Sequence, residues 1–437
     1  MHKSAVYKQS GQALVLAIIM IGVILTAFVF FFRTGKVAAS RLNQTHILDT
    51  AVYSGALVQA RALNTISYIN RAHIGHQVAM AHLVTLGSWA QFSYNESNQL
   101  ASGNPPAYLL SMMFGNEHGQ AYMSAAKAAG LAGVASTSGD LASAFRMHNN
   151  LIDTVFQHAQ KSILNSVPSV RKSIIDSVIK QNYENNKNVF GDATKFGLEI
   201  IDDTWDGFVK QVNAQGLKSS IQHSVSLYRF LDPRDHTTTN PWVVDARCPH
   251  KRHELRRRGS TQIDSTGRWA SSDTQSFHAL RSNRWIGCYY REYAMGWGYI
   301  PTSSMHNIGT EYIDNPPENF SSQDFWRWVK ESTNWNIHSG NSNPLSSSKA
   351  VSQRQVWSGG GLQPFFDVTD PKLFSTKFAL RLKRISPENI LVSTVSAAET
   401  VFAIPIISKN KSERASLFRP YWQARLSSSE VYRDQEH

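Results

Sequence analysis

One uninterrupted apolar stretch decides how this chain is organised: it runs from Ala13 to Phe32 and reads ALVLAIIMIGVILTAFVFFF. It contains no charged side chain, and only Gly22 and Thr26 depart from strongly apolar or small residues. An α-helix rises about 1.5 Å per residue, so this stretch would cover about 30 Å, the thickness of the hydrocarbon core of a bilayer. A helix in a soluble core rarely needs apolar residues all round, because one face normally meets water. The stretch therefore predicts a transmembrane helix at residues 13–32.

A cleaved signal peptide is the alternative interpretation of this stretch. Lys3 and Lys8 would form its basic region, and Val37-Ala38-Ala39 would be its small-residue cleavage site. Against this alternative, the stretch is longer than the ~7 to 15 apolar residues of a usual signal peptide. Arg33 and Lys36 also stand between it and the cleavage site. The membrane anchor is therefore the preferred interpretation.

The composition of the remaining chain indicates a folded protein with a basic surface. Hydrophobic residues make up 42% of the chain, and 11 Trp, 15 Tyr and 21 Phe supply large apolar side chains that disordered chains lack. Lys and Arg number 44 against 32 Asp and Glu, which gives a formal net charge of +12. Such a balance favours contact with an anionic partner, such as lipid headgroups, nucleic acid or a cell-surface polymer.

The segment after the apolar stretch is expected to continue as one long helix. No proline occurs before Pro105, so the helix can run without a break to about Tyr94. Small residues such as Ala51, Gly55 and Ala60 would let another backbone approach closely, as in a helical bundle or a filament of stacked helices. Apolar and small residues also recur at multiples of three or four, which gives a stripe for packing on a globular body: Leu42, Val52, Ala56, Leu63, Ile66 and Ile69.

The pattern then changes from helical to strand-like at about residue 218. Amphipathic helices are predicted near residues 120–134, 140–166 and 169–185. Alternating aromatic stretches predict strands at residues 221–231, 285–300, 378–384 and 400–407. We therefore expect an α+β fold in five consecutive parts: a tail (1–12), the transmembrane helix (13–32), a long amphipathic helix (33–102), a helical subdomain (103–217) and a β-rich, aromatic C-terminal subdomain (218–437).

Cys248 and Cys288 are the only cysteines, and three interpretations of them are open. A disulfide between them would close a long loop and would require an oxidising compartment. Two free thiols would fit a reducing compartment. A zinc site could add His250 and His253, although this Cys-x-His-x-x-His spacing is not a standard one. The disulfide is preferred, and it would place the globular part outside the cytoplasm.

The densest basic run is a candidate anion-contacting cluster, and only Glu254 interrupts it: Lys251, Arg252, Arg256, Arg257 and Arg258. A solvated loop is the preferred interpretation, ahead of a contact with an anionic lipid or polymer. Nucleic acid ranks below both as a partner, because the nearest aromatic platforms, Trp269 and Trp285, are not interleaved with the basic residues.

Patterns typical of enzymes or metal sites are sparse. The sequence has no phosphate loop of the Gly-x-x-x-x-Gly-Lys-Ser/Thr form, no Gly-x-Ser-x-Gly elbow and no His-Glu-x-x-His helix. His73 and His76 lie one helical turn apart and His82 follows, but helices carry such pairs routinely, so a structural role is preferred over a metal site. The aromatic run at residues 325–328 is expected to pack at the edge of a core. We predict no enzyme activity, no cofactor and no metal.

Six phrases in the chain point to one family. Three lie in and after the apolar stretch: GQALVL at 11–16, NQ at 43–44 and DTAVYSGA at 49–56. They resemble the N-terminal pilin-like module of the TadE/TadG-like Flp (tight-adherence) pilus-assembly proteins. Three later phrases are similar to larger bacterial members of that group: AMGWG at 294–298, GLQPFFD at 361–367 and RPYWQARL at 419–426.

The resemblance implies an assembly or anchoring component of a tight-adherence pilus and secretion machine. It implies a single-pass protein of the bacterial inner membrane with a cytoplasmic N-terminus and a periplasmic or extracellular globular part. Other pilus-assembly or pilin-like subunits would bind through the N-terminal helix. Leu16 stands where a processed pilin carries Glu, five residues after Gly11, so we expect an uncleaved anchor or a minor component. The alternative is a membrane-tethered periplasmic enzyme or binding protein with a site built from loops.

Overall fold

The computed structural model describes residues 12–103, 105–185, 196–264, 266–285, 287–302, 356–385, 390–404 and 414–433, and it is a mixed structure of helices and antiparallel sheets. The first helix, α1 (Gln12–Ser102), is 91 residues long. The prediction of one continuous helix from the apolar stretch is therefore confirmed. Gly103 ends α1 with φ 66°, and its N–H donates to the Leu100 carbonyl at 3.0 Å. A left-handed glycine is a common helix end because it lacks a Cβ.

The chain divides into two compact units, and neither is a continuous stretch of sequence. Unit 1 comprises residues 1–68, 161–210 and 366–437, and unit 2 comprises residues 69–160 and 211–365. These units differ from the consecutive division into 103–217 and 218–437 expected from the sequence. The difference arises because strands from distant parts of the chain pair within one sheet.

Unit 1 contains a four-stranded antiparallel sheet in the order β1-β8-β9-β10. Its strands are β1 (Phe196–Asp203), β8 (Ser375–Ile385), β9 (Leu391–Phe402) and β10 (Trp422–Ser427). β1 pairs with β8, so that Leu198 lies opposite Leu382. The short helix α10 (Glu430–Arg433) follows β10. The strand prediction at 378–384 is confirmed, whereas β1 lies in a segment that was expected to be helical.

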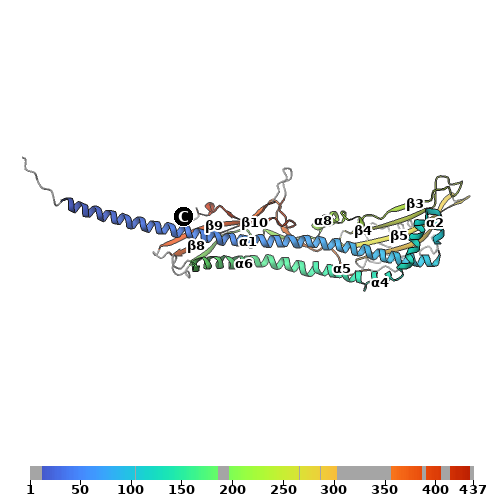
Figure 1. Ribbon diagram of the computed structural model, residues 1–437, viewed down its shortest axis with the longest axis horizontal. Coiled ribbons are helices and arrows are strands. Elements are labelled where there is room, and N and C mark those ends of the chain that lie inside the picture. Colours follow the sequence, from blue (N-terminus) through green and yellow to red (C-terminus); the bar gives the residue numbers. More distant parts are fainter. Residues whose placement is uncertain are drawn as a thin grey trace, which may run out of the picture. The chain divides into compact units, whose positions relative to one another are not determined.

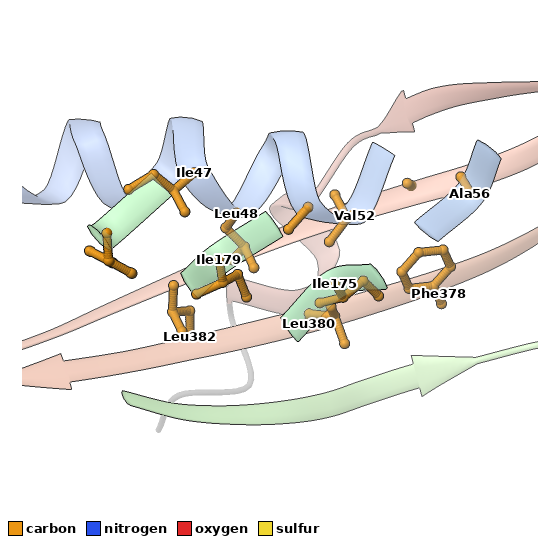
Figure 2. Close-up of a cluster of buried hydrophobic side chains, with 12 residues drawn as sticks. Ile47, Leu48, Val52, Ala56, Ile175, Ile179, Phe378, Leu380 and Leu382 are labelled. Carbon is orange, nitrogen blue, oxygen red and sulfur yellow. The ribbon is translucent and has the colours of Figure 1, made fainter. Parts of the chain in front are cut away.

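The core of unit 1 forms where two helices cover one face of this sheet. Helix α6 (Gln157–Asn185) lies beside α1, as the green and blue ribbons show in Figure 1. Figure 2 shows side chains from α1, α6 and β8 meeting in one cluster: Ile47, Leu48, Val52, Ala56, Ile175, Ile179, Phe378, Leu380 and Leu382. A Cβ added at Gly55 would lie 2.9 Å from side-chain atoms of both Ile175 and Phe378. The small residues of α1 therefore permit this close packing.

Helix α6 corrects the predicted break between residues 166 and 169. Pro168 lies inside the helix, which continues to Asn185. Proline removes one helical hydrogen bond and normally costs about 3 kcal/mol in a helix interior. Val167 and Ile175 are both buried in unit 1, so packing on either side of the proline outweighs this local cost.

Unit 2 contains a four-stranded antiparallel meander in the order β3-β4-β5-β6. Its strands are β3 (His236–Thr239), β4 (Glu254–Ile263), β5 (Trp269–Asn283) and β6 (Gly287–Pro301). The predicted strand at 285–300 corresponds to β6. Residues 69–102 of α1 pack on this sheet, where a Cβ at Gly298 would lie 2.1 Å from the Ser88 carbonyl oxygen. The phrase AMGWG thus supplies Gly298 where strand and helix backbones nearly touch, and Gly296 where helix side chains lie close to the strand.

Short helices complete unit 2: α2 (Ala107–Phe114), α3 (Asn116–Ser124), η1 (Ala125–Ala128), α4 (Leu131–Ala135), α5 (Asp140–Asn150), the π-helix η2 (Leu151–Phe156), α8 (Gln215–Val225) and η3 (Arg229–Leu231). Outside the two four-stranded sheets, the short strand β2 (Val209–Val212) pairs with β7 (Phe365–Val368).

One strand prediction is wrong, and a second is confirmed only in part. Residues 221–231 form the end of α8 and η3, because Leu217 and Ile221 are buried one helical turn apart. Of the strand expected at 400–407, residues 400–402 form the end of β9, which begins at Leu391 and stops at Phe402, and residues 403–404 are not in a strand. Residues 405–407 of that prediction lie outside the described residues.

Candidate functional site

The apolar stretch at the start of α1 is uncovered by the described remainder of the chain. Its fifteen large apolar side chains are 47–71% exposed, from Ile24 at the low end to Phe31 at the high end. Among the described residues, α1 is the one helix long and apolar enough to cross a membrane. Exposed apolar area of this size is unfavourable in water, so the stretch needs an apolar environment or partner.

The small-residue face further along α1 is buried, unlike the apolar stretch. Ala51, Ala56 and Ala60 are buried, and their partners are α6 and the sheet of unit 1. The side chains of β9 also bond to this part of the helix: Thr400 Oγ1 donates to the Ala56 carbonyl at 3.0 Å. This face packs on the chain's own globular body, so it does not offer a surface for stacking on other subunits.

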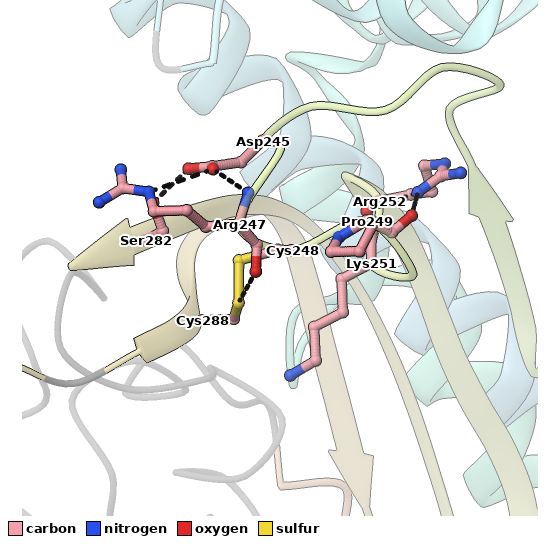
Figure 3. The surroundings of a disulfide bond; sticks show 8 residues. All are labelled: Asp245, Arg247, Cys248, Pro249, Lys251, Arg252, Ser282 and Cys288. Atoms are coloured by element: carbon pink, nitrogen blue, oxygen red, sulfur yellow. Dashed lines mark hydrogen bonds and ion pairs between the residues drawn. A yellow bond between two sulfur atoms is a disulfide. The ribbon is translucent and has the colours of Figure 1, made fainter. Parts of the chain in front are cut away.

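Cys248 and Cys288 are joined by a disulfide in unit 2, with their Cα atoms 6.1 Å apart. Figure 3 shows the surrounding contacts. The Asp245 carboxylate accepts hydrogen bonds from the Ser282 hydroxyl and from the Arg247 N–H, which holds the pKa of Asp245 below its usual value. The disulfide uses both cysteines that the zinc interpretation required, and no group of three or more potential metal ligands occurs within the described ranges.

The five residues of the basic cluster do not all lie on one face, and the expected loop is partly a strand. Arg256, Arg257 and Arg258 lie in β4, where side chains alternate between the two faces. Arg256 pairs with Glu254 at 2.7 Å, and Arg258 donates to the His236 carbonyl at 3.0 Å. Lys251 and Arg252 precede the strand, and Arg252 donates to the Pro249 carbonyl at 2.6 Å.

Arg257 lies on the face of β4 that meets α1, within a buried charge network that the sequence did not reveal. Its guanidinium lies 4.6 Å from the Trp89 ring and 3.7 Å from the Asp273 carboxylate. Asp273 is fully buried; it also pairs with Arg234 at 2.7 Å and accepts a hydrogen bond from the Ser88 hydroxyl. Burial raises the pKa of Asp273, and Arg234 opposes that rise.

The network is suited to fastening β5 to α1. The Asp273 carboxylate is surrounded by donors, as expected for a charge that must be compensated when it is buried. The Ser88 hydroxyl is 2.9 Å from Ser271 and donates to Asp273, and no described histidine is bonded to Ser88 to activate it as a nucleophile. Arg234 and Asp273 are far apart in sequence and belong to no motif, so only the folded sheet brings them together.

The three histidines considered from the sequence have separate surroundings. Burial, and to a smaller extent His76, lowers the pKa of His73 to about 4. The Nδ1 atom of His76 lies 2.6 Å from that of His148 on α5. The His82 ring packs edge-on against Tyr228 and Phe230. They do not converge on one point, so the structure gives no support to a joint metal site.

A cavity of about 760 Å³ lies in unit 1 between α6 and the β1 and β8 strands. Its walls are mainly apolar and include Ile175, Leu198 and Phe378. The ion pair between Arg171 and Asp203 lies at its lining, and Lys172 and Asp176 are also present. The cavity has the size of a small-molecule site, and none of the described residues that line it is a nucleophile paired with a base.

The aromatic run at 325–328 lies outside the described residues.

Comparison of the chain with protein-family models, with curated proteins and with solved structures finds no match.

Proposed function

We propose that this chain is a membrane-anchored, non-enzymatic assembly or anchoring component of a tight-adherence (Flp-type) pilus and secretion machine in the bacterial envelope. The observation that carries the proposal is the exposed apolar stretch at residues 13–32, which continues without a break into the packed part of α1. The resemblance of residues 11–16 and 49–56 to the pilin-like module of the TadE/TadG-like family is the reason for proposing a tight-adherence pilus machine.

The energetics of the stretch favour a bilayer as its environment. Fully burying a large apolar side chain is worth about 1.5–3 kcal/mol. Transferring fifteen such side chains from water to lipid therefore gains tens of kcal/mol. This free energy is enough for a single span to hold the protein in the membrane without other anchors. The continuous helix also fixes the direction of the first part of unit 1 relative to the span, because no turn separates them.

The position of Leu16 supports an anchor rather than a polymerising subunit. A carboxylate within an apolar helix is expensive and persists where it meets a partner charge. Leu16 is 67% exposed and carries no charge, so it offers no such register contact. In our proposal the chain stays at full length in the inner membrane, with the N-terminus in the cytoplasm and the disulfide-bearing unit on the oxidising side.

Photocrosslinking in native cells tests the proposal. A photoreactive phenylalanine analogue at Phe28, which is 70% exposed in the span, should capture other pilus-assembly or pilin-like membrane subunits. The same analogue at Tyr108, which is 74% exposed in unit 2, is the matched control and should not capture the same subunits. Adducts from Phe28 with lipid alone would contradict assembly through this helix. Intact mass of the membrane-extracted protein tests retention of residues 1–11.

The cavity in unit 1 favours a second candidate function, that of a membrane-tethered periplasmic binding protein or enzyme. Its volume of about 760 Å³ and mainly apolar lining would suit a small apolar ligand. Mass spectrometry of the purified full chain under native conditions tests this candidate. A retained small molecule that is lost after Leu198→Trp, which narrows the cavity, would favour it over the assembly role.

A further inference from the structure

The turn between β5 and β6 presents the most exposed large apolar side chain among the described residues. Trp285 is 88% exposed, and Arg284 beside it is also exposed. In the loop that precedes β4, Trp242 and Val243 are 45% and 51% exposed. A single exposed apolar residue needs no explanation, but a group of three on adjoining segments indicates an interaction surface.

Two links fix these segments to each other, as Figure 3 shows. The disulfide joins Cys248 of the loop to Cys288 of β6, and the Asp245 carboxylate accepts a hydrogen bond from Ser282 of β5. Ser282 and Cys288 lie opposite each other in the hairpin, three residues before and after Trp285. We call the resulting surface the hairpin tip, defined by Trp242, Val243, Arg247, Lys251, Arg284 and Trp285. Its segments are held together before any partner binds, which lowers the entropy cost of binding.

The hairpin tip is cationic as well as apolar. Arg247 keeps 67% of its side chain exposed, and Lys251 and Arg284 are exposed too. Asp245 is the sole acidic residue within residues 242–252 and 281–288, and its carboxylate is engaged by Ser282 and Arg247. The charge that faces solvent is therefore positive.

This combination selects one class of partner. Tryptophan side chains favour the interfacial layer of a bilayer, an exposed valine adds apolar area that lipid can cover, and Lys and Arg are attracted to the phosphates of anionic lipids. A single-stranded nucleic acid would instead need a groove that follows its backbone, whereas Trp285 projects from a turn. We propose that the hairpin tip binds the surface of an anionic lipid bilayer, as a membrane contact separate from the span at residues 13–32.

Vesicle flotation with the full chain tests this contact, with the apolar anchor held in a non-ionic amphipol. Vesicles of phosphatidylcholine with phosphatidylglycerol should carry the wild-type protein, and vesicles of phosphatidylcholine alone should carry much less. Arg247→Ser with Arg284→Ser should weaken binding about thirtyfold, at about 1 kcal/mol for each cation near the surface. Trp285→Ser should weaken binding about tenfold or more, because the variant has no indole to insert into the lipid.

Two exposed residues elsewhere in unit 2 provide matched controls. Tyr108→Ala removes an aromatic ring that is 74% exposed, and Lys127→Ser removes an exposed cation. Both variants should bind anionic vesicles like the wild type. Equal binding of wild-type protein to neutral and anionic vesicles would overturn the proposal. So would a soluble anionic polysaccharide that binds the wild type and the Trp285→Ser variant equally well and displaces both from vesicles, since that result would identify a polymer partner.

Discussion

Glu96 lies on α1 in unit 2, and its replacement by Gln tests how this unit tolerates buried charge. The side chain is 9% exposed, and burial raises its pKa from the usual 4.5 to about 7 against the opposing effect of Arg257. One pKa unit corresponds to about 1.4 kcal/mol, so this shift amounts to about 3 kcal/mol in the free energy of unfolding. Because the folded-state pKa is the higher one, that stability is present below pH 4.5 and is lost as the pH rises through 7.

Glu96→Gln keeps the shape of the protonated side chain and removes its titration. We expect the variant to be about 3 kcal/mol more stable than the wild type at about pH 8 and nearly equal to it at about pH 4. Urea unfolding of the detergent-solubilised full chain, followed by Trp fluorescence, measures the difference. Glu117→Gln is the matched control, because Glu117 is exposed in the same unit. A stability difference that is the same at both pH values would refute the reasoning.

Three further predictions concern the same unit. Gly298→Ala should destabilise the protein by several kcal/mol, because the added Cβ would lie 2.1 Å from a backbone oxygen of α1. Gly216→Ala, whose added Cβ has its nearest contact at 3.4 Å, should be close to neutral, and thermal unfolding compares the two variants. Replacing Cys248 and Cys288 by Ser should cost about 3–4 kcal/mol through the lost constraint on the unfolded chain, and two reactive thiols in unreduced, denatured wild-type protein would contradict the bond. Asp273→Asn should cost about 3–5 kcal/mol, because Arg234 would keep a buried charge without its partner; a loss below about 1 kcal/mol in urea unfolding would show that the network contributes little.

The local sequence was sufficient to predict features that depend on the hydrophobicity, spacing or number of residues along the chain. The uncharged apolar stretch and the absence of proline predicted the long first helix, which the structure extends from Gln12 to Ser102. Having only two cysteines limited the pairing to one bond, and that bond is present. The alternation at 378–384 predicted part of β8. In each case the decisive property was hydrophobicity, spacing or residue count along the chain.

Other errors came from segments whose local preference was overridden by packing. Two separate helices were predicted at 140–166 and 169–185, yet α6 continues through Pro168 because its two sides are buried against α1 and the sheet. The run at 251–258 suggested a solvated loop, yet pairing with β5 makes its second half a strand and turns Arg257 toward Asp273. Strand pairing gives backbone N–H and C=O groups their hydrogen-bond partners, and the local sequence does not indicate which strand supplies them.

The sequence by itself determined the uncharged apolar stretch, the continuous helix that follows it, the positive charge and the single choice of cysteine pair. Tertiary structure alone decided that β1 pairs with β8, that the small residues of α1 pack on the chain's own sheet, and that Arg234, Arg257 and Ser88 meet at Asp273. The physical reason is the range of the interactions. Helix formation and membrane partitioning depend on neighbouring residues, whereas sheet pairing and buried charge compensation depend on groups that lie far apart in sequence and meet only in the folded chain.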